Sequence, residues 1–227
     1  MKRRSKEVLA EIASAKEIAI SLSDPDKMPC SSYSIPASRC KVGSILRNVQ
    51  GTVCENCFAF ERGNYRFRNV QACLEKRFQS LGNPEWVNAM ETLIRHDNKG
   101  DTNYFRWHDS GDIQSEEHLA NICEIARRLP QIKFWLPTKE WKVCRDYFAS
   151  NPMPENLNVR LSIPRKNQDA PQEAEASDQF TYSEVFTDTG KASNAAYVCP
   201  AYHQGRKCLD CRKCWDKENL ITAYPEH

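Results

Sequence analysis

The fold of this chain is decided between residues 104 and 163, which read YFRWHDSGDIQSEEHLANICEIARRLPQIKFWLPTKEWKVCRDYFASNPMPENLNVRLSI. Short apolar and aromatic runs predict three strands, at 104–108, 133–136 and 158–163. Apolar residues at helical spacing predict two helices between them, at 115–129, with Ser115 as the cap, and at 140–150. Strands that alternate with helices in this way form a parallel sheet with crossover helices.

The same pattern continues on both sides of this stretch. We expect further strands at 28–38, 180–187 and 195–198, and further helices at 5–22, 68–81 and 85–96. The polar stretch 165–178 shows no periodicity and is expected to be a surface loop. The predicted fold class is therefore α/β, a partial (β/α) barrel of mostly parallel strands with an N-terminal helix and a cysteine-rich C-terminal module.

The sequence divides into three parts. Residues 1–27 contain an amphipathic helix, 28–198 form the partial-barrel core with a cysteine-containing loop, and 199–227 form the C-terminal module. The 227 residues carry 32 basic and 30 acidic side chains, so net charge alone does not indicate a nucleic-acid-binding protein. The mean hydropathy is −0.69, and no apolar run approaches the ~18 residues of a membrane span. Acidic residues interrupt the N-terminal helix, so neither a secretory nor a transit peptide is expected. We therefore expect a soluble, cytoplasmic protein with no membrane partner.

Eleven cysteines, an odd number, favour reduced thiols that serve metal binding or chemistry over a set of disulfides. The C-terminal group consists of Cys199, Cys208, Cys211 and Cys214. Three cysteines at successive x2 spacing in one tight loop, with a remote Cys-Pro, contain the elements of a bacterial ferredoxin site in another order. A 4Fe–4S cluster is the first interpretation, a four-cysteine zinc site is the alternative, and unmetallated core thiols are disfavoured. The basic neighbours are expected to lower the pKa of these thiols: Arg206, Lys207, Arg212 and Lys213.

A second group consists of Cys40, Cys54 and Cys57. Three thiolates leave one iron of a cubane without a protein ligand, which is the open position that metal chemistry requires. Two alternatives remain: Cys54 and Cys57 form half of a zinc knuckle or a redox pair, or Cys30 closes the site as a fourth ligand. The chain is thus expected to hold one 4Fe–4S cluster or two. The remaining cysteines are predicted core residues: Cys73, Cys123 and Cys144.

Polar residues follow the strand at 104–108. At the carboxyl end of a parallel strand, Asp109 and Asp112 are placed to accept hydrogen bonds from an ammonium group or a ribose hydroxyl, and Gly111 permits close approach of the backbone. The ends of the next two strands are expected to face the same edge. The candidate cofactor-binding residues are Asp109, Ser110, Gly111, Asp112, Thr138, Lys139, Arg160 and Ser162. The alternative is an ordinary strand-to-helix turn capped by Asp112.

The stretch 58–78 interleaves aromatic and basic residues. Such a pattern suits single-stranded nucleic acid, through backbone charge and base stacking. It equally suits a helix beside an anionic cluster or substrate, or a simple amphipathic surface. The basic residues of this stretch are Arg62, Arg66, Arg68, Lys76 and Arg77.

Several short motifs together resemble the phage gene product 88 family, over roughly Met28 to Trp215. They are Ser32–Ala37, Cys54–Ala59, Phe105–Asp112, Phe134-Trp135 and Cys214-Trp215. The layout of that family resembles a divergent radical S-adenosylmethionine (SAM) core, with three cysteines after the first strand and a GGE-like turn after the second. A phage origin would place the protein in the host cytoplasm.

The radical SAM resemblance implies roles for the residues of both cysteine groups. Cys40, Cys54 and Cys57 would bind a 4Fe–4S cluster whose open iron chelates the amino and carboxylate groups of SAM, and Asp112 of the Ser110–Asp112 turn would face the amino group. The C-terminal cluster would be auxiliary. The sequence departs from the usual pattern in its x13 cysteine spacing, in carrying Asp instead of Glu, and in the two-helix segment before the second strand.

Two functions follow from these observations. The first is an iron–sulfur enzyme that cleaves SAM to a 5′-deoxyadenosyl radical, which abstracts hydrogen from an unknown substrate. The alternative is a non-catalytic iron–sulfur or zinc protein that binds nucleic acid or a host protein.

Overall fold

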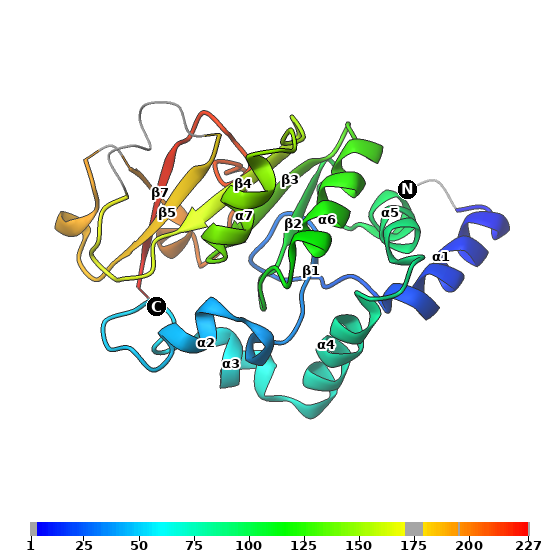
Figure 1. The fold of residues 1–227 in the computed structure, drawn as a ribbon, viewed down its shortest axis with the longest axis horizontal. Coiled ribbons are helices and arrows are strands. Elements are labelled where there is room, and N and C mark those ends of the chain that lie inside the picture. The colour runs from blue at the N-terminus through cyan, green and yellow to red at the C-terminus, as the bar shows by residue number, and fades with distance from the viewer. Residues whose placement is uncertain (1–3, 171–178, 195, 227) are drawn as a thin grey trace.

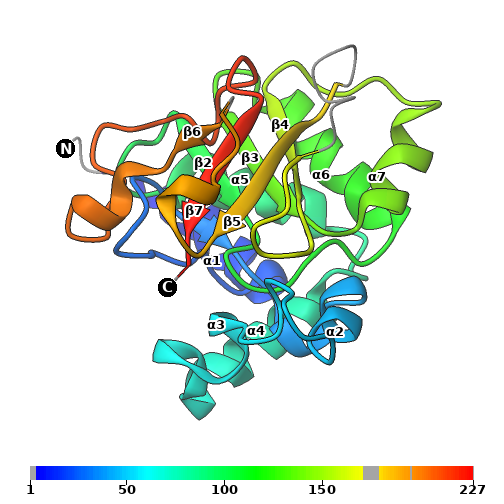
Figure 2. The same ribbon diagram turned by 90° about the vertical axis from the view of Figure 1, so that its left-hand side faces the viewer.

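The structure is a computed structural model that describes residues 4–170, 179–194 and 196–226. Within these residues, the centre is a seven-stranded sheet in the order β1-β2-β3-β4-β5-β7-β6, and all neighbouring strands are parallel. The sheet is twisted and open, not closed into a barrel (Figures 1 and 2). The strands are β1 (Ser32–Tyr33), β2 (Tyr104–Trp107), β3 (Lys133–Thr138), β4 (Leu157–Ser162), β5 (Thr181–Phe186), β6 (Tyr197–Val198) and β7 (Ile221–Pro225).

The predicted α/β class with a partial barrel is confirmed. Each predicted strand has a counterpart from β1 to β6, although Ala195 lies outside the described residues. Strand β7 was not predicted, and the structure places it between β5 and β6, with which it pairs. Of the predicted loop at 165–178, residues 165–170 are irregular and 171–178 lie outside the described residues.

Five longer helices match the predicted ones within a few residues: α1 (Lys6–Ala19), α4 (Arg68–Ser80), α5 (Trp86–Asp97), α6 (Glu116–Arg128) and α7 (Trp141–Phe148). The hydroxyls of Ser5 and Ser115 accept hydrogen bonds from the backbone N–H groups of Val8 (3.2 Å) and His118 (3.1 Å), so both are N-caps. The loop between β1 and α4 contains two short helices that were not predicted, α2 (Val42–Leu46) and α3 (Phe58–Glu61).

The two faces of the sheet carry different side chains because successive residues of a strand point to opposite sides. On one face, Phe105, Trp107 and Phe134 are fully buried in the main core. Helices α6 and α7 lie over this face (Figure 1), and the predicted core residues Cys123 and Cys144 are fully buried there. Helix α1 packs against α5 at one end of the sheet.

The other face of the sheet is covered by the C-terminal module. The indole Nε1 of Trp215 donates a 2.8 Å hydrogen bond to the carbonyl of Phe105 in β2, and Trp135 of β3 contacts Trp215 edge-on. The strands therefore separate the main core from a second face that the C-terminal module covers.

Tyr33 connects four elements of the core, and its loss tests their packing. Its fully buried hydroxyl bonds the carbonyl of Ala19 (3.1 Å), the hydroxyl of Ser80 (3.1 Å) and the indole N–H of Trp86 (3.4 Å). We expect Tyr33→Phe to lower the free energy of unfolding by about 1–3 kcal/mol, because it leaves buried polar groups without a partner. Urea denaturation measures this loss. Tyr202→Phe, at a side chain that is 49% exposed, is the control and should leave stability unchanged; equal stability of the two variants would contradict the assignment.

Candidate metal centres around one cavity

The first cysteine group lies in the long loop that follows β1, which is tied to the carboxyl edge of the sheet. The N–H of Val42 donates to the carboxylate of Glu140 (2.9 Å) at the start of α7, and the N–H of Val53 donates to the carbonyl of Pro164 (2.9 Å) after β4. The ammonium of Lys41 donates to the carbonyl of Gln114 (2.5 Å) before α6. The loop is therefore held over the ends of three consecutive strands.

Gly43 shows how closely the thiols of this group approach. A Cβ atom placed on Gly43 would lie 3.0 Å from the Cβ of Cys40, 3.7 Å from its Sγ and 3.6 Å from the Sγ of Cys54. Cys57 immediately precedes α3, and its N–H donates to the carbonyl of Cys54 (3.2 Å). Because Gly43 has no side chain, there is room beside the sulfurs of Cys40 and Cys54, two of the three cysteines in this group.

Burial controls the protonation of these thiols. Burial, together with the nearby Asp112 carboxylate and the thiols of Cys57 and Cys54, raises the pKa of Cys40 to about 12. The pKa of Cys54 is also raised by burial, although the ammonium of Lys139 opposes the shift. Without a cation these groups remain protonated thiols, whereas a bound metal would hold them as thiolates.

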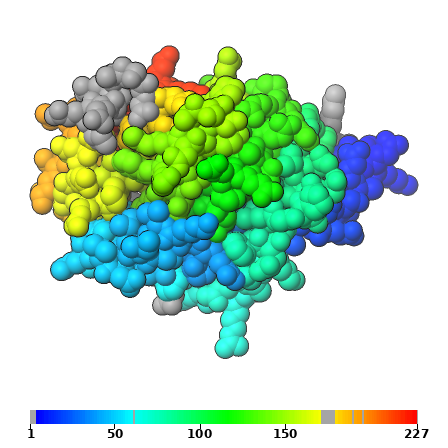
Figure 3. Space-filling model, viewed as in Figure 1, coloured from blue at the N-terminus to red at the C-terminus, as the bar shows by residue number. Residues whose placement is uncertain are grey.

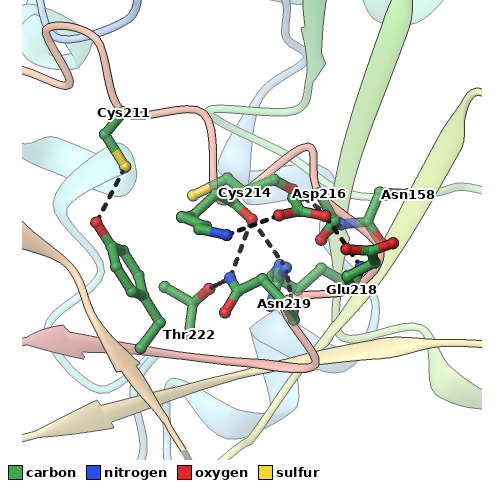
Figure 4. A network of polar contacts seen from close by, with 10 residues as sticks. Asn158, Cys211, Cys214, Asp216, Glu218, Asn219 and Thr222 are labelled. Atoms are coloured by element: carbon green, nitrogen blue, oxygen red, sulfur yellow. Dashed lines mark hydrogen bonds and ion pairs between the residues drawn. The ribbon is translucent and has the colours of Figure 1, made fainter.

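The C-terminal cysteine group is held mainly by backbone hydrogen bonds. The N–H groups of Cys199 and Cys208 donate to the carbonyls of Ala223 (2.8 Å) and Lys27 (3.0 Å), and the N–H of Cys211 donates to the carbonyl of Cys208 (2.9 Å). Two sulfurs have tyrosine partners. Cys214 Sγ lies 3.0 Å from the hydroxyl of Tyr224. Cys211 Sγ lies 3.5 Å from the hydroxyl of Tyr197, a contact that Figure 4 shows. These sulfurs belong to the module, and the tyrosines belong to the edge strand β6 and its neighbour β7.

Strand β4 anchors this module through two polar residues. Asn158 donates its amide N–H to the carbonyl of Cys214 (2.9 Å), as Figure 4 shows. The fully buried guanidinium of Arg160 donates to the carbonyls of Tyr182 (2.6 Å), Asn219 (2.9 Å) and Lys213 (3.4 Å). Arg160, a candidate cofactor-binding residue in the sequence, therefore holds the cysteine module in place instead.

Cys30 lies with the C-terminal group. It packs in an apolar cluster with Trp135, Cys214 and Trp215, and the thiol of Cys208 is among the groups that influence its ionisation. Burial raises the pKa of Cys30 to about 12. The structure thus places near Cys208 and Cys214 the residue that was considered as a fourth ligand for the Cys40 group.

The basic side chains of the module do not lower the pKa of its buried thiols as expected. Arg212 forms an ion pair with Asp101 (3.0 Å), and Lys213 pairs with Asp216 (2.9 Å). Burial raises the pKa of Cys214 to about 11 and also raises that of Cys208. The expectation was wrong for these two thiols because desolvation outweighs the surrounding positive charge.

One cavity of about 430 Å³ connects the two cysteine groups. Its lining includes Cys40, Cys54 and Cys57 from the first group and Cys199, Cys208 and Cys214 from the second. Seven of the eight candidate cofactor-binding residues also line it: Asp109, Ser110, Gly111, Asp112, Thr138, Lys139 and Ser162. The carboxyl ends of β2, β3 and β4 thus meet at this cavity, as is usual for parallel sheets.

Asp112 is the most constrained residue of the cavity. Its buried carboxylate accepts hydrogen bonds from the hydroxyl of Thr138 (2.6 Å) and from the N–H groups of Ile113 (2.8 Å) and Lys139 (2.9 Å). Burial raises its pKa to about 6, against the lowering effect of these three bonds. Most of its accepting capacity is used within the protein, so it joins the end of β2 to the end of β3.

The rest of this turn is tied to β1. The carboxylate of Asp109 accepts from the hydroxyls of Ser32 (3.0 Å) and Tyr65 (2.9 Å), and the hydroxyl of Ser110 donates to the carbonyl of Ile35 (3.0 Å). Gly111 has a φ of +82°, and a Cβ there would lie 2.7 Å from the same carbonyl oxygen. Only glycine fits this position without strain.

Sequence reasoning missed some residues of the cavity and misplaced one basic residue. The guanidinium of Arg106 lies 4.5 Å from the ring centroid of Trp135, lines the cavity and influences the ionisation of Cys30 and Cys208. The alternation of 104–108 was a signal for its orientation, since Phe105 and Trp107 point into the core. Arg77, expected to contact nucleic acid, is buried and donates to the hydroxyl of Ser23 (2.7 Å).

The family model for gene product 88 matches residues 2–217. The chain belongs to the gene product 88 family. This match confirms the family resemblance seen in the sequence motifs. Neither the comparison with curated proteins nor that with solved structures found a match.

Among the described residues, no helix combines the length and the hydrophobicity that a membrane span requires. Among them, no three histidine, cysteine, aspartate or glutamate side chains are grouped so that they hold one metal ion.

The role of Arg160 can be tested by substitution. We expect Arg160→Met to lower the free energy of unfolding by roughly 3 kcal/mol, because three backbone carbonyls lose their donor. Urea denaturation measures the loss, and Arg127→Met, at an exposed arginine on α6, is the control. A stability equal to that of the control would show that the module does not depend on this guanidinium.

Proposed function

We propose that this protein is an iron–sulfur protein with two metal centres that face a common cavity. Cys40, Cys54 and Cys57 would hold the first, and Cys199, Cys208, Cys211 and Cys214 the second. The observation that carries the proposal is the cavity of about 430 Å³ whose lining includes cysteines of both groups. Thiols that gather around one space are the ligands that iron–sulfur clusters use.

Local structure around the first group supports a bulky metal centre with an open position. Gly43 leaves space where a side chain would approach the Cβ of Cys40 to 3.0 Å and the Sγ of Cys54 to 3.6 Å. Three thiols serve this centre, since Cys30 lies near the other group. A 4Fe–4S cluster held by three cysteines keeps one iron free for a ligand in the cavity.

We further propose that this centre serves radical SAM chemistry. The support is the order of the elements: the cysteine loop follows β1, the Ser110–Asp112 turn follows β2, and both reach the same cavity of an open parallel sheet. A reduced cluster would supply the electron that splits SAM into methionine and a 5′-deoxyadenosyl radical, which then takes a hydrogen atom from the substrate. Asp112 would position Thr138 and Lys139 at this cavity, because its own carboxylate is engaged by three hydrogen bonds.

Metal analysis of cysteine variants tests the two centres. After anaerobic reconstitution we expect about eight iron and eight sulfide per chain, and about four of each in the Cys54→Ala/Cys57→Ala variant, because one cubane is lost. Cys73→Ala, at a half-buried thiol on α4, is the matched control and should retain full iron. Cys208→Ala/Cys211→Ala should lose the other cluster and keep the first.

Iron content that is unchanged in Cys54→Ala/Cys57→Ala would refute the first ligand set. A colourless wild-type protein with stoichiometric zinc would refute both clusters. Each double variant is checked by circular dichroism and gel filtration, so that loss of iron is separated from loss of fold.

Product analysis tests the radical chemistry. Wild-type protein and Cys73→Ala, reduced with dithionite in the presence of SAM, should yield 5′-deoxyadenosine, and SAM should alter the EPR signal of the reduced cluster. Cys54→Ala/Cys57→Ala should yield none. If wild-type protein with full iron content forms no 5′-deoxyadenosine and its EPR signal does not change with SAM, the radical SAM proposal is refuted. The iron–sulfur proposal would still stand.

A further inference from the structure

Positive charge is concentrated in one segment of this nearly neutral chain. Residues 39–78 contain eight basic and three acidic residues, whereas the rest of the chain contains 24 basic and 27 acidic residues. The segment therefore has a formal charge of +5 and the remainder −3. The segment lies along the lower part of the molecule in Figure 3, in light blue to cyan.

Part of this segment projects from the body, and we call residues 58–68 the basic arm. It comprises α3, a 3-10 turn over Gly63–Arg66 and the start of α4. Its aromatic rings are exposed, by 60% at Phe58 and 48% at Phe67. Three exposed cations accompany them, and none pairs with a described carboxylate: Arg62, Arg66 and Arg68.

The rings of the basic arm are held by local contacts. Phe58 meets Tyr65 edge-on, with centroids 6.2 Å apart, and a Cβ on Gly63 would lie 2.6 Å from its ring. The hydroxyl of Tyr65 donates to Asp109 (2.9 Å), which fastens the arm to the end of β2. Phe58 is thus an oriented ring that is exposed on one side.

The basic arm also borders the cavity. Phe58 and Ala59 directly follow Cys57, and both contribute to the lining of the cavity. A polymer bound along the arm would therefore pass the opening next to the first cysteine group.

We propose that the basic arm binds single-stranded nucleic acid, with unpaired bases stacked on Phe58 and Phe67 and phosphates beside Arg62, Arg66 and Arg68. Exposed rings between cations are the arrangement that stacks bases and neutralises the backbone. In a duplex the ring faces of the bases are covered by neighbouring bases, so they cannot stack on exposed protein rings. An anionic membrane is less suited, because membrane-surface segments are long amphipathic helices and the arm is a single helical turn followed by a 3-10 turn.

This inference does not depend on the proposed metal chemistry, since the arm carries no metal ligand. It is tested with the reconstituted protein, a fluorescein-labelled 20-nucleotide single strand as DNA and as RNA, and fluorescence anisotropy. The Arg62→Gln/Arg66→Gln/Arg68→Gln variant should bind at least tenfold more weakly at low salt and reduce the slope of log K against log salt by about two, because each phosphate contact to a single strand contributes about 0.7. Phe58→Ala/Phe67→Ala should weaken binding about tenfold and leave the slope nearly unchanged.

The matched control is Lys6→Gln/Lys99→Gln/Lys133→Gln, which removes the same charge from exposed lysines away from the arm. It should bind as the wild type does. Equal affinity of the arm variant and the control, the absence of wild-type binding, or equal affinity for a duplex of the same length would each overturn the proposal. So would arm-dependent binding to anionic phosphatidylserine vesicles without binding to the oligonucleotides. Iron content measured on the same samples separates these outcomes from a failure of the metal proposal.

Discussion

The arrangement of the cavity depends on the hydrogen bonds that the buried carboxylate of Asp112 accepts. It holds the hydroxyl of Thr138 at 2.6 Å and the N–H of Lys139 at 2.9 Å, and so joins the ends of two parallel strands. The Thr138 hydroxyl in turn accepts from the N–H of Glu140 (3.0 Å), whose carboxylate accepts from Val42 (2.9 Å) beside Cys40. Burial raises the pKa of Asp112 to about 6, so the hydrogen bonds only partly offset the cost of desolvating its charge.

The parallel sheet explains why both cysteine groups reach one space. All strands deliver their carboxyl ends to the same edge, where the loop with Cys40, Cys54 and Cys57 is tied. The C-terminal module covers the face opposite the helices, and Arg160 and Asn158 of β4 bind its backbone carbonyls. The cavity lies between the first cysteine loop, at the carboxyl edge of the sheet, and the C-terminal module, on one face of the sheet. Two segments that are far apart in sequence therefore line the same cavity.

Local sequence patterns were sufficient for most of the fold and for part of the site. Helical spacing and serine caps predicted α1 and α6, and short apolar and aromatic runs predicted β2 and β4, because these signals depend on neighbouring residues only. Strand β7 and the short helices of the cysteine loop escaped prediction, since distant pairing and the loop's attachments decide them. The buried contacts of Arg77 and Arg160 were not foreseen for a related reason. A basic side chain in a sequence does not reveal whether hydroxyls or carbonyls inside the protein will accept its hydrogen bonds.

The sequence by itself determined the parallel α/β class, the family of the chain and the two sets of cysteines, because periodicity and spacing are properties of the chain alone. Only the tertiary structure decided that these sets share a cavity, that Cys30 lies with Cys214, and that the basic arm borders the same opening. It also raised the pKa of the Cys214 thiol, since burial outweighs the charge of the nearby Arg160. Burial and contacts between distant segments arise only when the sheet is assembled, so they cannot be predicted from local sequence patterns.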